Sequence, residues 1–392
     1  YTLIPTIGTG LLILSAVPKT FANRVLSFFP FVTIGLISYS AYLWHQPILA
    51  FTRHRMIGEI SESFLFLLCF LSLIMGYVSW NFIEKPFRTK NKISNKTILN
   101  FSLLGMIFFI LVGSILQSNN GFQNRLPEEL SRNTERRFNN ECNFFDLGDN
   151  LFLDNNLSSC MSGKQNIYLI GDSHAQALSF EFRNALNKRG LNLITITDSG
   201  CFPFIGASLD PPKKSCESMK IFLDEKVLRS NNNVIIAARW RYHLEGSRYN
   251  NGEGGIEKGP SGQVFLSNPN YELFDFIGDA INQLSESSNL FIVNQIPELG
   301  FDPIKRKFLL GQEGATTHSY SNYLKANSRV NKLFRNLTNA TLIETDKLVC
   351  SKNTQRCLSE IDNQLLYVDY DHPSDFFANM IANEFLESFI AN

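Results

Sequence analysis

The chain has no net charge, because its 36 lysines and arginines equal its 36 acidic residues. Proteins that bind nucleic acid usually carry a basic excess, so this balance argues against nucleic acid as a partner. The chain also has no initiating Met and no basic stretch before its first apolar run, which begins at Tyr1. That run therefore does not have the pattern of a signal peptide. We expect the chain to start inside a larger membrane region.

The composition changes near residue 118, from apolar runs rich in Phe, Leu and Ile to an ordinary soluble pattern. A helix that crosses a bilayer needs roughly 20 mostly apolar residues, with about 17 as a lower limit. We therefore predict a partial bundle of transmembrane helices over residues 1–118, with the lipid bilayer as partner. Buried helices of a soluble protein are the alternative. The four candidate spans are residues 1–17, 31–51, 64–82 and 98–116.

A basic cluster follows the third apolar run, and basic loops tend to remain in the cytoplasm. With this loop inside, the fourth run carries the chain outward and places residues 119–392 on the extracytoplasmic side. The cluster consists of Lys85, Arg88, Lys90, Lys92 and Lys96.

Cysteines with the spacing of a zinc site are lacking, so no metal is expected. Cys69 lies in an apolar run, and the other six cysteines all follow residue 118. An even set in an oxidising compartment indicates disulfides, although six cysteines allow 15 pairings and unpaired thiols remain an alternative. Pairing of neighbours along the chain gives Cys142–Cys160, Cys201–Cys216 and Cys350–Cys357.

Residues 119–165 are polar, and we expect them to form a linker packed on a domain at 166–392. In that domain, short apolar runs alternate with segments of helical pattern, which predicts an α/β three-layer sandwich with a mainly parallel sheet. The predicted strands are 167–170, 191–197, 234–238, 290–294 and 341–344. The predicted helices are 175–188, 217–229, 271–285, 320–337 and 375–390.

The first predicted strand runs directly into Gly171, Asp172 and Ser173. Ligands of such folds bind beyond the carboxyl ends of the strands, where Ser173 lies. Far downstream, Asp369 and His372 stand three residues apart. A Ser nucleophile, a His base and an Asp that orients the His are sufficient for acyl transfer. The alternatives are that Ser173 only caps a helix, that the late acids only cap the last helix, and that Asp371 orients the His.

Two motifs in the apolar half resemble the end of membrane acyltransferase family three. They are Ser38-Tyr39 with Tyr42-Leu43-Trp44-His45-Gln46-Pro47, and Asn81-Phe82-Ile83-Glu84-Lys85-Pro86-Phe87-Arg88. The resemblance covers about residues 1–90 and implies movement of acyl groups across a membrane. The family's catalytic His and donor-binding arginines lie in earlier helices, outside this sequence. His45 is a candidate residue of the acyl path, or else an interfacial anchor beside Trp44.

Gly171-Asp172-Ser173 and Asp369-x-x-His372 resemble the first and last blocks of the SGNH hydrolase superfamily. The resemblance implies that Ser173, His372 and Asp369 are catalytic, and that the backbone N–H groups of Ser173 and Gly200 form an oxyanion hole. An Asn expected after the third strand is missing.

Where that Asn is expected, the sequence reads Ala237-Ala238-Arg239-Trp240-Arg241. Either Arg239 or the region of Trp240 substitutes for the Asn, or the oxyanion hole has two donors. Arg239, Trp240 and His243 are candidate substrate contacts. Trp240 with Tyr242 and His243 is a candidate sugar-stacking surface, and packing of these residues in the core is the alternative.

The two halves in this order resemble bacterial lipopolysaccharide O-antigen O-acetyltransferases. The resemblance implies transfer of an acyl group, most often acetyl, to a hydroxyl of a cell-surface glycan. Acetyl-CoA would be the donor to the complete membrane domain, and the soluble domain would bind no cofactor. The location implied is the bacterial inner membrane, multi-pass, with residues 119–392 in the periplasm. A membrane-anchored carbohydrate esterase and an inactive fragment that needs further helices are the alternatives.

Overall fold

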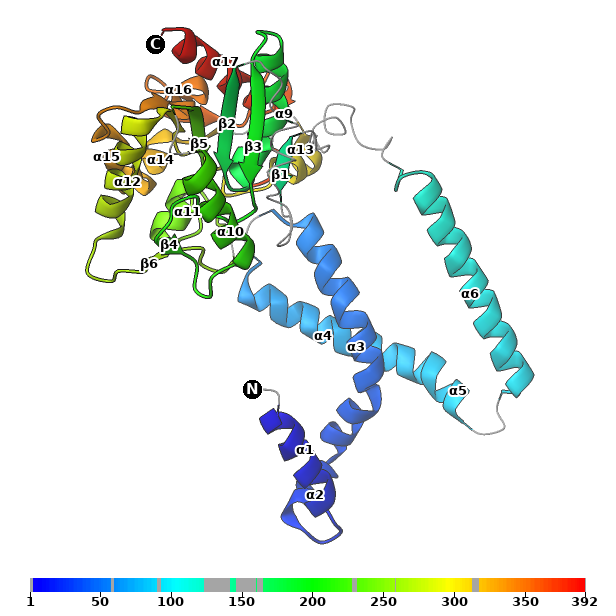
Figure 1. Cartoon of the computed structure of the whole chain (residues 1–392). Helices are drawn as coiled ribbons and strands as arrows, with labels where there is room; N and C mark the ends of the chain where they lie inside the picture. Colours follow the sequence, from blue (N-terminus) through cyan, green and yellow to red (C-terminus); the bar gives the residue numbers. More distant parts are fainter. Residues whose placement is uncertain are drawn as a thin grey trace. The chain divides into compact units, whose positions relative to one another are not determined.

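Figure 1 shows the computed structural model, which divides into two compact units, Tyr1–Phe122 and Gln123–Asn392. Each unit is described by itself. Most of the predicted linker at 119–165 lies outside the described residues. The structure describes residues 3–57, 60–89, 93–122, 142–145, 160, 165–227, 231–257, 259–311 and 317–391.

The first unit is helical, and each of the four apolar runs forms a helix. Two of the described helices, Glu62–Arg88 and Asn95–Ser118, are long and apolar enough to cross a membrane. The helices are α1 (Leu3–Ser15), α2 (Phe21–Leu26), α3 (Phe29–Arg55), α4 (Glu62–Ser79), the π-helix η1 (Trp80–Glu84), α5 (Lys85–Arg88) and α6 (Asn95–Ser118).

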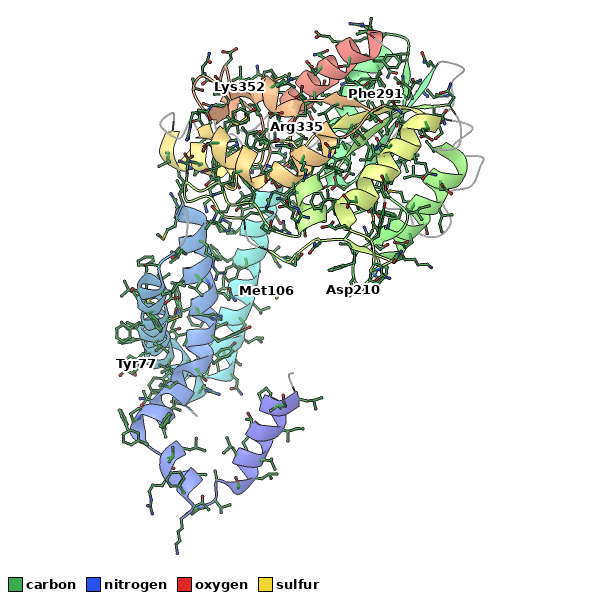
Figure 2. The ribbon with its side chains drawn as sticks, turned by 90° about the vertical axis from the view of Figure 1, so that its left-hand side faces the viewer. Tyr77, Met106, Asp210, Phe291, Arg335 and Lys352 are labelled. Atoms are coloured by element: carbon green, nitrogen blue, oxygen red, sulfur yellow. A yellow bond between two sulfur atoms is a disulfide. The ribbon has the colours of Figure 1, made fainter. Side chains whose placement is uncertain are left out.

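Two of the four predicted spanning helices thus meet this requirement, and the other two stay predictions. Helix α1 has 13 residues, and at about 1.5 Å per residue it is shorter than the roughly 30 Å of a bilayer core. Helix α3 has 27 residues but includes Ser40, His45 and Gln46 and ends in Arg53, His54 and Arg55. These polar groups lower its hydropathy. By contrast, α6 has no buried residue, and side chains such as Met106 project from it (Figure 2).

Helices α3 and α4 pack through small residues. A Cβ on Gly76 would lie 2.8 Å from the backbone of Ala41, and Ser40 and Ser72 are both buried. Small side chains let helix backbones approach closely, as in packed membrane helices. The hydroxyl of Ser40 donates to Glu84 at 2.8 Å, which joins α3 to the Phe-Ile-Glu-Lys-Pro-Phe-Arg run.

The second unit is built on a six-stranded sheet whose strand order is β1-β3-β2-β5-β7-β9. All of its neighbouring strands are parallel, as the alternating sequence pattern predicts. Parallel strands bring their carboxyl ends to one edge of the sheet. The strands are β1 (Asn143–Phe145), β2 (Asn166–Gly171), β3 (Asn192–Thr197), β5 (Asn233–Ala237), β7 (Asn289–Val293) and β9 (Thr341–Ile343).

Helices cover both faces of this sheet, which confirms the three-layer sandwich (Figure 1). Ile167 and Leu169 of β2 face a core shared with α9 (Ser173–Asn187) and α17 (Asp375–Ala391). The alternate residues of β2, Tyr168 and Ile170, face the opposite core. That core is shared with α10 (Lys214–Phe222), α11 (Trp240–Glu245), α12 (Leu273–Ser287) and α15 (Ser328–Arg335).

The predicted helices are present with two changes. Residues 320–337 form two helices, α14 (Tyr320–Ala326) and α15, which are divided at the buried Asn327, whose φ of −104° and ψ of 18° depart from helical values. Residues 217–229 begin as α10 and continue as the π-helix η3 (Leu223–Val227). The sequence did not predict three of the helices, which are α11, α13 (Pro303–Leu310) and α16 (Thr345–Val349). It also did not predict the edge strand β1, which lies in the expected linker, or the small strands β4 (Ala207–Ser208), β6 (Phe265–Leu266), β8 (Thr317–Ser319), β10 (Cys350–Ser351), β11 (Arg356–Leu358), β12 (Glu360–Ile361) and β13 (Gln364–Leu365).

All three predicted disulfides are formed. Cys142–Cys160 ties down the start of the edge strand β1, and Cys201–Cys216 ties the loop after β3 to α10. Cys350–Cys357 joins the antiparallel strands β10 and β11.

The packing of α17 predicts the effect of one core substitution. Phe385 is fully buried. The centroid of its ring lies 5.0 Å from that of Phe291 (labelled in Figure 2) and 5.7 Å from that of Phe182 on α9. Phe385→Ala should lower the free energy of unfolding by about 3 kcal/mol or more through lost burial and a cavity. Phe265→Ala is the control, because Phe265 is 56% exposed. Urea unfolding of the two variants should differ clearly, and equal midpoints would contradict this packing.

Candidate active site

Ser173 lies at a sharp turn between β2 and α9, and its neighbours fix that turn. Gly171 has a φ of 150°, and a Cβ there would lie 1.8 Å from the Ala237 carbonyl oxygen on β5. Only glycine fits this close approach. Asp172 caps α9 by accepting a hydrogen bond from the His174 backbone N–H at 2.8 Å. Ser173 is thus held as the first residue of the helix.

The other carboxylate oxygen of Asp172 ties the turn to α11. It accepts hydrogen bonds from the Arg239 backbone N–H at 2.9 Å and from His243 Nε2 at 2.8 Å. Burial alone would raise the pKa of Asp172, but the His243 hydrogen bond and the charges of His174 and His243 lower it to about 2. The expected contact of His243 with substrate is wrong, because this ring is 1% exposed and bonded to Asp172.

The structure brings the three predicted catalytic residues together across the length of the domain. Ser173 Oγ lies 2.8 Å from His372 Nε2, and His372 Nδ1 lies 2.9 and 3.0 Å from the two carboxylate oxygens of Asp369. The His372 backbone N–H also donates to Asp369, at 2.9 Å. This is the geometry of a nucleophile, a base and the group that orients the base.

Asp371 is a second carboxylate beside the same imidazole. Its Oδ1 lies 3.3 Å from His372 Nδ1, so Asp369 is the closer partner and Asp371 the more distant one. Burial alone would lower the pKa of His372, but the charge of Asp371 and the hydrogen bond to Asp369 raise it above its usual value. Burial alone would raise the pKa of Asp371, whereas the charge of His372 and the His174 hydrogen bond hold it well below its usual value.

Arg239 occupies the place at which the resemblance leads one to expect Asn. Its guanidinium is bonded to Glu257, Glu298 and Asp371, and the residue is 6% exposed. Burial would lower the pKa of Arg239, and the charges of Glu298 and Asp371 raise it. These partners make Arg239 a part of the framework behind His372 and do not support the expected substrate contact.

Trp240 belongs to the core, so the expectation that it contacts substrate is wrong. Its side chain is fully buried, and its Nε1 donates to the Val293 carbonyl at 2.8 Å. The rings of Phe334 and Phe202 both meet the Trp240 ring edge-on, with centroids 5.0 Å and 5.8 Å from it. The alternative of core packing is therefore the one observed.

Gly200 lies in the loop after β3, the strand next to β2. The Asp198 backbone N–H donates to the Gly171 carbonyl at 3.2 Å, which holds this loop beside the Ser173 turn. The Asp198 carboxylate accepts from Lys213 at 2.7 Å, and the Cys201–Cys216 disulfide holds the other side of the loop. Gly200 as an oxyanion donor stays a prediction. The role of His45 in the acyl path also stays a prediction. His45 lies on α3, and its ring centroid is 5.1 Å from that of Tyr42.

Two groups of described residues bring together atoms that could bind a metal: His174, Asp371 and His372, and Asp198, Cys201 and Cys216. The first group is already linked by hydrogen bonds to each other, Ser173 and Asp369. In the second, the two cysteines are joined in a disulfide. Neither group fits a metal site as arranged.

The raised pKa of His372 can be measured directly. We predict that the imidazole titrates above about pH 6.5, the ordinary value for histidine, because two carboxylates face Nδ1. Asp369→Asn should move the midpoint down. Histidine-labelled NMR on the full chain can follow all six histidines, and His372→Gln assigns the signal. A midpoint at or below 6.5 in the unaltered chain would contradict the arrangement.

The chain is similar in sequence to a known protein family and to known proteins. Residues 141–387 match the family described as "SGNH domain (fused to AT3 domains)". The O-acetyltransferase OatA of Staphylococcus aureus strain MRSA252 is 31% identical over 104 residues, which are 25% of this chain and 17% of that protein.

Two solved structures are similar at low identity. The periplasmic domain of a lipopolysaccharide acetyltransferase of Salmonella ser. Paratyphi A is 19% identical, with a TM-score of 0.41, and the match covers 60% of this chain and 87% of that one. The carbohydrate acetylesterase Est24 of Sinorhizobium meliloti is 13% identical, with a TM-score of 0.33, over 58% of this chain and 99% of that one. The family model covers well over half of the sequence, and the chain therefore belongs to the family of SGNH domains fused to AT3 domains.

Proposed function

We propose that this protein transfers an acyl group, acetyl in the first instance, to a hydroxyl of a cell-surface glycan such as lipopolysaccharide O-antigen. The observation that carries the proposal is the continuous hydrogen-bonded chain from Ser173 through His372 to Asp369. Membership of the SGNH family and the similarity to an O-acetyltransferase support it.

In the first step, Ser173 Oγ attacks the carbonyl carbon of the acyl donor. His372 Nε2, 2.8 Å away, takes the hydroxyl proton as the new C–O bond forms. The bond from the acyl carbon to the leaving group then breaks, and His372 returns the proton to that group. The product is an ester on Ser173, and Asp369 stabilises the imidazolium formed in between.

In the second step, a glycan hydroxyl attacks the Ser173 ester. His372 takes the proton of that hydroxyl, the bond between the acyl carbon and Ser173 Oγ breaks, and the proton passes to Ser173 Oγ. The acyl group then forms an ester with the sugar, and the enzyme is restored. Water in place of the glycan would make the same site an esterase.

The tetrahedral intermediate of each step carries an oxyanion. Ser173 is the first residue of α9, and free N–H groups at a helix N-terminus favour negative charge. We assign the backbone N–H groups of Ser173 and Gly200 as the two donors. One such donor can contribute about 10²–10³ in rate.

The membrane location is also part of the proposal. Helices Glu62–Arg88 and Asn95–Ser118 support association with a bilayer. The basic residues from Lys85 to Lys96 favour a cytoplasmic connection between these helices, and we propose that the second unit lies in the periplasm, outside a bacterial inner membrane. A complete multi-pass acyltransferase domain would carry acetyl groups from acetyl-CoA to Ser173.

Ser173→Ala should abolish glycan acetylation, because Ser173 is the hydroxyl that bonds His372 Nε2 among the residues the structure describes. The full chain is supplied with an activated acetyl ester and lipopolysaccharide oligosaccharides, and mass spectrometry counts the acetyl groups gained. Ser179→Ala on the same helix is the control, since its hydroxyl bonds only to the Gln176 carbonyl among the described residues.

Retained transfer by Ser173→Ala would refute the role of Ser173. Ester cleavage without glycan gain would favour the esterase. No reaction in the unaltered chain would mean that it needs further membrane helices.

A further inference from the structure

Three arginines and three carboxylates form a buried cluster behind the active-site loop. Arg241 pairs with Glu298 at 3.0 Å, and Arg248 pairs with Glu257. Arg239 contacts both of these glutamates, and its Nε lies 3.1 Å from Asp371 Oδ2. Each carboxylate of the cluster, Glu257, Glu298 and Asp371, therefore has an arginine as counter-charge.

Asp371 is the point at which this cluster meets the active site. Its Oδ2 lies 3.1 Å from Arg239 Nε in an ion pair and 3.0 Å from His174 Nε2. Its Oδ1 lies 3.3 Å from His372 Nδ1. Asp369 faces the same nitrogen at 2.9 Å. Two carboxylates thus lie beside Nδ1 of the imidazole, and Arg239 forms an ion pair with that of Asp371.

We propose that Arg239 is a positioning residue that neutralises Asp371 and thereby sets how readily His372 gives up its proton and becomes a base. This inference rests on the proposed roles of Ser173 and His372. A general base must be unprotonated before it can accept the serine proton. Two uncompensated carboxylates at hydrogen-bond distance would hold His372 as imidazolium, since nearby negative charge favours the charged form.

The same contacts explain why an arginine replaces the expected Asn at this position. The Arg239 backbone N–H bonds Asp172, so the residue holds the Ser173 turn with its main chain and the His372 loop with its side chain. A neutral amide could bond Asp371 but could not balance its charge. Arg239 therefore acts through other residues and does not itself contact the reacting atoms.

The groups that face His372 come from three elements. Its own loop contributes Asp369 and Asp371, and α9 contributes Ser173 and His174, whose ring lies 4.9 Å from that of His372. The start of α11 contributes Arg239 through Asp371. Arg239 Nε also donates to Glu298, and its terminal nitrogens pair with Glu257 and Glu298, so these two glutamates are the other charges that a change at Arg239 would affect.

The test measures the pH dependence of Ser173 reactivity. A fluorophosphonate probe labels an activated serine without an acyl donor or a glycan, so the readout is independent of transferase activity. The full chain in detergent is labelled over a series of pH values. Arg239→Gln should raise the pH midpoint of labelling by about one unit or more, the range expected for a charge partner within reach.

Arg248→Gln is the matched control, because Arg248 shares Glu257 with Arg239 but has no described bond to Asp371. Its midpoint should stay close to that of the unaltered chain. Arg239→Lys keeps the positive charge, so its pH midpoint of labelling should lie close to that of the unaltered chain and below that of Arg239→Gln. A purely structural role of the planar guanidinium would not be rescued in this way.

Asp371→Asn closes the cycle. By itself, Asp371→Asn should lower the pH midpoint of labelling. In a chain that already carries Asp371→Asn, adding Arg239→Gln should no longer raise the midpoint, because the carboxylate that Arg239 neutralises is gone. An unchanged midpoint in folded Arg239→Gln, or an equal rise in the double variant, would overturn the proposal.

If circular dichroism shows that Arg239→Gln does not fold, the test rests on Asp371→Asn. An unchanged pH midpoint of labelling in that variant would then overturn the proposal. Labelling that is absent in the unaltered chain would instead count against Ser173 as nucleophile. Normal labelling without glycan acetylation would count only against the transferase function.

Discussion

The buried carboxylate of Asp172 is the interaction on which the arrangement of the site depends. It accepts hydrogen bonds from the backbone of His174 and of Arg239 and from the side chain of His243, and so it joins β2, α9 and α11 at one edge of the sheet. An ionised group that is 2% exposed is stable only with such partners. The same bonds fix the direction of Ser173 and place Arg239 behind the loop of His372. One side chain therefore orients the nucleophile and positions the counter-charge of its base.

The fold turns this local arrangement into a complete site. Parallel pairing brings the carboxyl ends of β2, β3 and β5 together, so the Ser173 turn, the Gly200 loop and Arg239 become neighbours. Helix α17 packs on α9 and follows the loop that carries Asp369 and His372. Two disulfides hold the β3 side of the sheet, one at the start of β1 and one in the Gly200 loop. The catalytic distances thus depend on a rigid core.

Much of this could be predicted from local sequence. The position of Ser173 after a strand was predictable from the Gly-Asp-Ser motif, whereas the close approach at Gly171 and the helix cap by Asp172 became evident only in the structure. The three disulfides followed from pairing neighbours along the chain, and the parallel sheet followed from alternating apolar strands and helices. In each case the deciding information lies within a short stretch.

The errors have a common cause, which is that burial and distant partners cannot be read from a short stretch. Trp240 and His243 look like substrate contacts, but both rings are buried. The partners of Arg239 come from segments 18, 59 and more than 100 residues away in sequence, and Glu298 belongs to no motif. The number of spanning helices stays a prediction, because the polar residues inside α3 and the early end of α1 distinguish these two helices from the two that are long and apolar enough to span.

The central claim is that Ser173 carries the acyl group between donor and glycan. The most direct test is to incubate the full chain with an activated acetyl ester, quench it in acid, digest it and locate acetyl groups by tandem mass spectrometry. The account predicts an acetyl ester on Ser173 that disappears when oligosaccharide is added before the quench, with a matching gain on the sugar. Acetylation of the sugar with no acetyl group on Ser173 at any time, under conditions that preserve a serine ester, would contradict it.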